Sequence, residues 1–211
     1  MDRKLKHVGV VQGSRAWLSA REQTPWTIGA SDAASAMGIP EAYEGQYALY
    51  NKKLGKNEFK KANVAMSWGT DHEEIAAQEY LKTQPEGTVM LTVGMFHSEE
   101  LALVASVDRV CVNETRGTWL VEIKCPFSKR PADLINDDKF LIQTHQQMLL
   151  SGIHSCDLYV WTPELGVACK TIPFDGELWS TRIYPRIKEF QDAVRDHDDT
   201  KFKRGARRVR L

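Results

Sequence analysis

The 211-residue sequence lacks an excess of either charge, because 28 lysines and arginines balance 28 aspartates and glutamates. A neutral chain has no overall field that draws it to a nucleic acid or a membrane, so binding to either depends on local basic patches. It also lacks an apolar run long enough to span a membrane, and no linker, repeat or low-complexity segment divides it. We therefore expect a soluble protein with one main domain and no membrane contact.

Cysteine is scarce and unpatterned. Cys111, Cys125, Cys156 and Cys169 form no Cys-x-x-Cys pair and show no spacing typical of a disulfide framework. We expect these thiols to be reduced, as they are in the cytoplasm. The basic segment 1–6 is not followed by the apolar stretch of a secretory signal. The sequence therefore predicts a cytoplasmic location.

Several common catalytic signatures are absent as well. The sequence contains neither a Gly-x-Ser-x-Gly nucleophile turn nor a Walker phosphate loop. His72, His97, His145 and His154 do not show zinc-ligand spacing, such as two histidines on adjacent turns of one helix. These absences argue against a serine hydrolase, a P-loop nucleotide hydrolase and a zinc site.

Hydrophobic periodicity predicts a change from helices to strands along the chain. Helical spacing covers 14–23, 31–37, 44–54 and 67–82, with Ser31 as an expected N-cap and Gly38 as a stop. Later elements are strands at 88–96, 101–112 and 118–125, a helix at 138–150, a strand hairpin at 156–161 and 167–172, and a last helix from Gly176 that Pro185 kinks or restarts. The predicted fold is α/β, with helices on a central mixed sheet in a domain of residues 1–200, followed by a basic tail at 201–211.

The most informative pattern is an aspartate that is followed, after a turn, by Glu-x-Lys on a strand. Asp108 ends one apolar strand, and Glu122 and Lys124 alternate with Val121 and Ile123 on the next. Because side chains alternate between the faces of a strand, Glu122 and Lys124 point the same way. The segment between the strands is typical of a hairpin connection, which would bring Asp108 across from Glu122. Two carboxylates and an ammonium on one patch suit Mg²⁺-dependent phosphodiester hydrolysis.

A structural explanation of the same residues competes with the catalytic one. Charged residues between valine and isoleucine are typical of any half-exposed strand, and Glu122 and Lys124 could form a simple ion pair. Taken alone, the Glu-x-Lys motif favours this explanation, since short motifs often match by chance. The upstream aspartate and the flanking helices shift the balance toward a metal site.

Two of the expected helices carry polar residues that would complete such a site. Glu73 lies in the first turns of the helix at 67–82, where an acidic residue often serves only to stabilise the helix end. Gln143, beside Ile142, could point inward, whereas a solvated polar face explains Gln146 and Gln147. The helices therefore offer Glu73 and Gln143 as candidates.

Five segments in order carry a family resemblance, and they lie between Trp17 and Gly152. They are Trp17-Leu18-Ser19-Ala20-Arg21, Gly29-Ala30-Ser31-Asp32, Trp68-Gly69 with Glu73, Ser106-Val107-Asp108 with Glu122-Ile123-Lys124-Cys125-Pro126-Phe127, and Gln143. This ordered run resembles the lambda exonuclease/YqaJ recombinase family of the PD-(D/E)XK nuclease fold, and it is most similar to prophage-type alkaline exonucleases. Two departures are Val107, where the family's archetype has proline, and His145, where a second glutamine is usual. The first is harmless for metal binding, and the second leaves the role of His145 open.

The resemblance implies a set of residues for each part of the site. Metal ligands, for Mg²⁺ or its substitute Mn²⁺, would be Asp108, Glu122, the Ile123 carbonyl and Glu73, and the remaining catalytic residues would be Lys124 and Gln143. Residues that bind the DNA 5′-phosphate and backbone would be Arg21, Ser31, Ser106 and Arg130. The physics agrees, because a guanidinium binds phosphate through two hydrogen bonds and a helix start offers free N–H groups. Without the resemblance, a helix cap would explain Ser31 and a surface ion pair Arg21 equally well.

The sequence therefore predicts a Mg²⁺-dependent 5′-to-3′ exonuclease that digests one strand of linear double-stranded DNA to 5′-mononucleotides. The family further implies a role in recombination with a single-strand annealing partner protein, a homotrimer around DNA, and a bacterial, prophage-type origin. The alternatives are a PD-(D/E)XK endonuclease of restriction or repair, and a non-catalytic DNA-end-binding recombination protein. With a nuclease core, we expect the basic tail at 201–211 to follow the DNA backbone.

Overall fold

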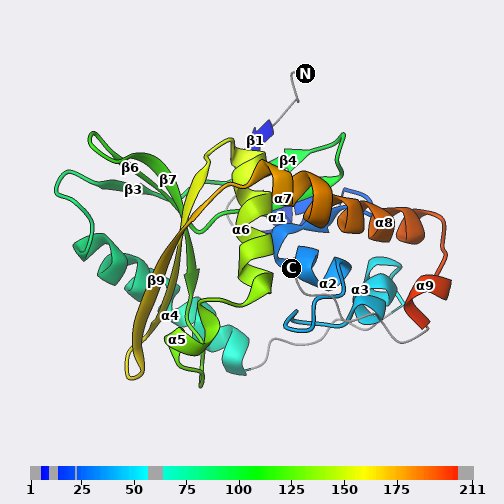
Figure 1. The fold of residues 1–211 in the computed structure, drawn as a ribbon, viewed down its shortest axis with the longest axis horizontal. Coiled ribbons are helices and arrows are strands. Elements are labelled where there is room, and N and C mark those ends of the chain that lie inside the picture. Colours follow the sequence, from blue (N-terminus) through cyan, green and yellow to red (C-terminus); the bar gives the residue numbers. More distant parts are fainter. Residues whose placement is uncertain (1–5, 10–13, 22, 57–63, 204–211) are drawn as a thin grey trace.

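The computed structural model describes residues 6–9, 14–21, 23–56 and 64–203, and Figure 1 shows their arrangement. The helices are α1 (Arg15–Arg21), α2 (Ala33–Ala36), α3 (Gln46–Lys53), α4 (Val64–Lys82), α5 (Pro131–Leu134), α6 (Asp138–Ser151), α7 (Gly176–Leu178), α8 (Tyr184–Arg195) and α9 (Thr200–Lys203), with shorter turns η1 (Ala30–Asp32) and η2 (Trp179–Ile183). The strands are β1 (Lys6–Val8), β2 (Ile28–Gly29), β3 (Val89–Leu91), β4 (Met95–Ser98), β5 (Leu103–Ser106), β6 (Arg109–Asn113), β7 (Gly117–Lys124), β8 (Ser155–Thr162) and β9 (Gly166–Pro173). The expected α/β class is confirmed.

The described strands form two mixed sheets, where the sequence predicted one. Their orders are β1-β4-β5-β2 and β3-β6-β7-β8-β9, with β2–β5 and β7–β8 as the parallel pairs. The single strand expected at 101–112 is wrong, because β5 ends at Ser106 in the first sheet and β6 begins at Arg109 in the second. The strand expected at 88–96 likewise divides into β3 and β4. Val107 and Asp108 therefore stand where the chain crosses from one sheet to the other.

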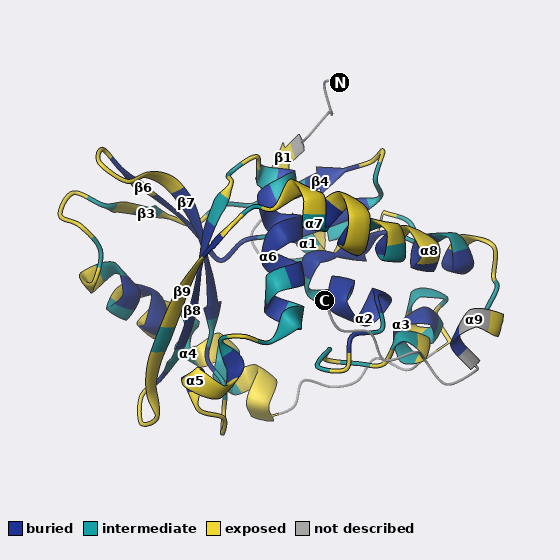
Figure 2. Cartoon of the chain, viewed as in Figure 1, coloured by how far each residue is buried: buried dark blue, intermediate teal, exposed yellow. Residues whose placement is uncertain are grey.

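Helix α6 lies between the two sheets and is buried on nearly all sides (Figures 1 and 2). Nine of its fourteen residues are buried, so it has no broad solvated face. The Gln146 Nε2 group donates to the carbonyl oxygens of Ile28 and Val104, at 2.9 Å each, and so ties β2 and β5 to the helix. The solvated position expected for Gln146 and Gln147 is wrong, because both side chains are buried and the Nε2 group of each donates to partners inside the fold.

His145 on the same helix has a structural role in the fold. Its Nδ1 lies 2.7 Å from the Leu141 carbonyl oxygen, and its Nε2 accepts a hydrogen bond from the Asp175 N–H at 3.2 Å. The ring also packs 5.7 Å from that of Phe174. His145 thus joins α6 to the segment before α7 and does not line the pocket described below.

The C-terminal part of the chain closes the other side of the core. Pro185 lies in the first turn of α8, directly after η2, so the last helix restarts there. Phe202 on α9 packs against Tyr50 and Phe190, with ring centroids 5.3 and 5.5 Å apart. The chain therefore contributes to the core as far as α9, and residues 204–211 of the expected tail lie outside the described residues.

No helix within the described ranges is long and apolar enough to cross a membrane.

A buried polar cluster fastens α4 to the five-stranded sheet. Asp157 on β8 accepts hydrogen bonds from the Tyr80 hydroxyl at 2.5 Å, Arg116 Nη2 at 2.7 Å and the Thr171 hydroxyl at 2.7 Å. Trp119 Nε1 donates in turn to the Tyr80 oxygen at 2.7 Å. Burial would raise the pKa of Asp157, but the hydrogen bonds from Arg116, Tyr80 and Thr171 outweigh it and hold the pKa below its usual value. The ionised carboxylate is therefore the form that stabilises the fold.

We expect Asp157→Asn to lower the free energy of unfolding at neutral pH by about 1–3 kcal/mol, since an amide leaves the three donors with weaker acceptors. Because the folded pKa lies below the unfolded one, the carboxylate contributes fully above about pH 4, and this contribution is lost as the pH falls further. The difference in the free energy of unfolding between wild type and variant, measured by urea titration, should therefore be smaller at about pH 3.5 than at about pH 7. An equal difference at both pH values would refute a stabilising role for the negative charge of Asp157.

Candidate active site

The crossing between the sheets brings Asp108 to the strand that carries Glu122. β6 and β7 pair antiparallel with Arg109 opposite Val121, so Asp108, one residue before β6, falls opposite Glu122. The Ile123 N–H donates to Asp108 Oδ2 at 2.7 Å. The predicted hairpin is confirmed, and it joins the two carboxylates at the end of the five-stranded sheet.

Glu122 is almost fully buried, with 1% of its surface exposed, and three side chains compensate for the lost water. Gln143 Nε2 donates to its Oε1 at 2.5 Å, Gln147 Nε2 donates to its Oε2 at 2.6 Å, and the Lys124 ammonium forms an ion pair with Oε1. Gln143 and Gln147 are four residues apart and so lie on one face of α6. Gln147 also donates to the Ser106 carbonyl at 2.9 Å, which ties the other sheet to the same helix.

Asp108 and Glu122 lie next to each other, so a negative charge on one makes a negative charge on the other less favourable. Burial raises the pKa of Asp108 well above its ordinary value and the charge on Glu122 raises it further, while Lys124 and the Ile123 N–H act in the opposite direction. Burial alone would lower the pKa of Lys124, but Glu122, Tyr43 and Asp108 raise it above its usual range. Lys124 is therefore a cation at neutral pH that donates hydrogen bonds and balances one of the negative charges.

Glu73 approaches Asp108 and Glu122 from α4, which lies on the face of the five-stranded sheet opposite α6. Arg109 holds it through Nη1 at 3.2 Å and holds Glu74 through Nη2 at 2.6 Å. The same Nη1 donates to the carbonyl of Asp108 at 2.6 Å. One buried guanidinium thus fixes the helix that carries Glu73 to the start of β6.

The other end of the site gathers hydrogen-bond donors from α1 and η1. Arg21 Nη2 donates to the Ser31 hydroxyl at 2.6 Å, and the guanidinium carbon lies 4.9 Å from the centroid of the Trp17 ring. Trp17 Nε1 donates to the Ser106 hydroxyl at 2.7 Å. A Cβ added to Gly29 would lie 2.8 Å from Arg21 Nη2, so the guanidinium rests directly on the backbone at this glycine.

Ser31 is not the N-cap that the sequence predicted. It lies inside η1, whose N-cap is Gly29, and its hydroxyl serves Arg21 instead. The adjacent Asp32 pairs with Lys53 at 3.6 Å and with Arg21 and Lys52 at 3.8 Å. Burial would raise the pKa of Asp32, but these three cations outweigh it and lower the pKa. Three cations therefore outnumber the two carboxylates at this end, Asp32 and the Lys52 partner Glu44, which favours an anionic ligand.

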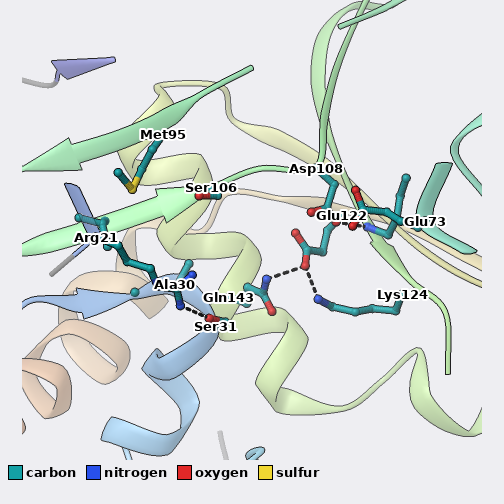
Figure 3. Close-up of a pocket in the computed structure, with 13 residues that line it drawn as sticks. Arg21, Ala30, Ser31, Glu73, Met95, Ser106, Asp108, Glu122, Lys124 and Gln143 are labelled. Carbon is teal, nitrogen blue, oxygen red and sulfur yellow. Dashed lines mark hydrogen bonds and ion pairs between the residues drawn. The ribbon is translucent and has the colours of Figure 1, made fainter. Parts of the chain in front are cut away.

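Both ends line one pocket of about 190 Å³, with Arg21 and Ser31 on one side and the carboxylates on the other (Figure 3). Nine of the ten predicted site residues line it: Arg21, Ser31, Glu73, Ser106, Asp108, Glu122, Ile123, Lys124 and Gln143. Ser106 ends a strand of one sheet and Asp108 directly precedes a strand of the other, so their shared position comes from the crossing and not from one strand face. Arg130 lies apart from the pocket, where it is exposed and bonded to Asp133 at 3.1 Å.

The carboxylate end fits a divalent metal ion. Within the part of the chain that the structure describes, no three His, Cys, Asp or Glu side chains are grouped closely enough to hold a metal by themselves. Mg²⁺, however, commonly takes one or two protein carboxylates and completes its shell with water and substrate phosphate. A cation here would relieve the repulsion that raises the pKa of Asp108 beside Glu122. The donor set therefore fits a metal that shares its coordination with a substrate.

Two residues of this site did not emerge from the sequence. Gln147 was assigned to solvent, although it lies one helical turn after Gln143 and holds the second oxygen of Glu122. Arg109 gave a weak signal, as a charged residue directly before the apolar Val110 in a strand. Its partners Glu74 and Glu73 lie 35 and 36 positions away in the sequence, so only the fold reveals these contacts.

Comparison with known proteins identifies the family and the fold. Residues 16–154 match the model of the YqaJ-like viral recombinase domain. Among solved structures, the chain is similar to an alkaline exonuclease, LHK-Exo, from Laribacter hongkongensis, with 22% identity, a TM-score of 0.67 and coverage of 88% of this chain and 95% of that one. The complex of LHK-Exo with dAMP gives 23% identity, a TM-score of 0.68 and the same coverage. A phage-related exonuclease from Haemophilus somnus 129PT gives 15% identity, a TM-score of 0.59 and coverage of 82% and 93%.

These similarities show that the chain has the α/β fold of these exonucleases, which is consistent with the expected PD-(D/E)XK nuclease fold. They extend over 88% and 82% of the chain. No curated protein sequence matches the chain significantly.

We expect Gly29→Ala to weaken binding of a 5′-phosphorylated oligonucleotide about tenfold or more, because the new Cβ displaces a guanidinium that forms charged hydrogen bonds. Gly45→Ala is the matched control: Gly45 has similar backbone angles (φ −70°, ψ 153°, against −75° and 150° for Gly29), and its Cβ would meet nothing within 4 Å. Fluorescence anisotropy measures both affinities. Equal affinities in the two variants would show that Arg21 does not act from the observed position.

Proposed function

This chain belongs to the YqaJ-like viral recombinase family, and from that premise we propose that it is a Mg²⁺-dependent exonuclease that digests one strand of linear double-stranded DNA from the 5′ end. The released products would be 5′-mononucleotides. Support comes from the structures with the same fold, which are an alkaline exonuclease and a phage-related exonuclease. One of them was solved with dAMP, a 5′-mononucleotide.

The observation that carries this proposal is the joining of two chemical environments in one pocket. Arg21, Ser31 and Ser106 offer donors to an anion, and Asp108 with Glu122 and Lys124 offers ligands to a metal and a cation to a phosphate. A terminal phosphate held at the first end would present a neighbouring phosphodiester bond to the second. Such positioning supplies much of the rate of phosphoryl transfer, because the chemistry requires little else from the protein.

Each residue has a role in this proposal. Asp108, Glu122 and the Ile123 carbonyl would hold the metal, with Glu73 as a further ligand once it exchanges part of its contact with Arg109. The bound Mg²⁺, or Mn²⁺ in its place, would activate water and neutralise charge on the phosphate. Gln143 orients Glu122 through its hydrogen bond. Lys124, held as a cation, would orient the attacking water and balance the charge that develops.

The family adds a biological setting to the proposal. We infer a role in phage-type recombination, in which the strand left by digestion passes to a single-strand annealing partner protein. A homotrimer that encloses the DNA and a cytoplasmic location in a bacterial cell belong to the same inference. The basic residues of the tail at 201–211 would contact the DNA backbone.

An endonuclease of the same fold is the main competing function. The group of Arg21, Ser31 and Trp17 favours the exonuclease, since only an end-dependent enzyme needs to grip a terminal phosphate. A non-catalytic DNA-end binder is disfavoured by the buried Glu122 and Lys124 pair, which end binding alone does not require.

In Mg²⁺, the wild type should digest linear duplex with 5′-phosphates and leave covalently closed circular duplex intact. Arg21→Ala should slow digestion of 5′-phosphorylated ends by about tenfold or more, and should change digestion of 5′-hydroxyl ends far less, because the guanidinium binds the terminal phosphate. Arg15→Ala, at an exposed position on the same helix, is the matched control. Gel analysis of the three substrates measures each rate.

Rapid cutting of closed circles would favour the endonuclease. An equal loss on both kinds of end in Arg21→Ala would remove Arg21 from end recognition. Absence of any cleavage by the folded wild type would refute the nuclease proposal itself.

A further inference from the structure

Tyr43 is an exposed aromatic side chain beside the carboxylate end of the pocket. It lies between α2 and α3, and 62% of its surface is accessible, the largest exposed fraction among the tyrosines, tryptophans and phenylalanines of the described ranges. A ring in this position gains little from the hydrophobic effect. An exposed aromatic next to a reactive site is instead typical of a surface that receives a flat ligand.

The Lys139 ammonium contacts the Tyr43 ring, and the backbone around it is anchored. The Lys139 ammonium lies 5.2 Å from the centroid of the Tyr43 ring, and Asp137 pairs with that ammonium at 3.0 Å. On either side of Tyr43 in the sequence, Ala42 packs against the core and Glu44 forms an ion pair with a lysine of α3. These contacts restrict the ring, which lowers the conformational entropy that it loses when a ligand stacks on it.

A chain of contacts connects Tyr43 with the reactive end of the pocket. Lys139 lies 4.8 Å from the centroid of the Phe140 ring, and Lys124 lies 5.6 Å from the same centroid. Tyr43 is also among the groups that raise the pKa of Lys124, which agrees with this arrangement of the side chains. A ligand with a phosphate at Lys124 therefore has its adjoining group within reach of Tyr43.

We propose that Tyr43 forms a base-stacking subsite, which receives a nucleobase next to the phosphate at Lys124. The ligand class is an unpaired nucleobase of the strand being digested. One face of the ring rests on the Lys139 cation, and the exposed part is open to the base. Stacking of this kind tolerates any sequence, because every base has a π-face, and this suits an enzyme that digests whatever strand it meets.

The inference rests on the proposed function and adds the recognition of a base to that of phosphate. It also assigns separate roles to the two aromatic rings that neighbour Lys139. Phe140 is buried and supports both lysines, whereas Tyr43 faces outward and contacts the substrate.

The test compares intact DNA with DNA that lacks single bases. Duplexes carry an abasic residue at the first, second or third nucleotide of the 5′-phosphorylated strand, and binding is measured by anisotropy in Ca²⁺ as well as by digestion in Mg²⁺. Tyr43→Ala should weaken binding and raise KM for intact DNA about 5- to 150-fold, the range for one base on an aromatic ring, with kcat nearly unchanged. Tyr43→Phe and Tyr43→Trp should retain wild-type binding.

The decisive comparison is between intact and abasic DNA, for wild type and for Tyr43→Ala. At one of the three positions, wild type should lose the same factor that Tyr43→Ala loses on intact DNA, and Tyr43→Ala should lose nothing further. Tyr47→Ala, which changes an exposed tyrosine that stacks on Tyr50, is the matched control and should behave as wild type. A 2-aminopurine at the same position should be quenched by wild type and not by Tyr43→Ala.

Three results would overturn the subsite: unchanged binding in Tyr43→Ala, equal losses on intact and abasic DNA at every position, or a Tyr43→Phe variant as weak as Tyr43→Ala. The 2-aminopurine experiment needs no cleavage, so it separates the two proposals. Quenching without digestion would refute the nuclease and keep the subsite, whereas digestion without dependence on Tyr43 would do the reverse.

Discussion

The fold is organised around a carboxylate that is held almost completely out of contact with water. Glu122 sits at the end of β7 with almost no exposed surface, so its charge requires partners. They come from Lys124 on its own strand and from Gln143 and Gln147 on α6. This requirement explains why a central helix between two sheets carries amides on a buried face, and why moving that helix would remove two of the three partners of the charge.

The second constraint is the crossing between the sheets. Because β5 and β6 belong to different sheets, Asp108 lies at their junction, opposite Glu122, while Ser106 faces the Trp17 and Arg21 group. The short separation of Ser106 and Asp108 in the sequence thus joins the Arg21 end of the pocket to its carboxylate end. Arg109 fixes α4 at the same junction, and Tyr43 approaches from the segment before α3. The site therefore depends on the meeting of both sheets and three helices.

Much of this could be predicted from the sequence where the signal is local. The alternation of Glu122 and Lys124 with Val121 and Ile123 predicted the strand correctly, because side-chain direction on a strand follows from sequence spacing alone. The hairpin connection predicted the register that places Asp108 across from Glu122. The break at Val107 could not be seen, since the apolar residues on both sides are equally suited to one long strand. Gln146 and Gln147 were misassigned because a helix buried on all sides has no polar face to read. Ser31 was expected as a cap, and only the packing of Arg21 on Gly29 reveals its actual partner.

The central claim is that Asp108 and Glu122 together form a divalent-metal site, and calorimetric titration with Mn²⁺ tests it most directly. Wild type should bind Mn²⁺, and Asp108→Asn and Glu122→Gln should each lose that binding while they remain folded by circular dichroism. Glu74→Gln, which changes an exposed carboxylate outside the pocket, should bind as wild type does. Undiminished Mn²⁺ binding in either pocket variant would contradict the account.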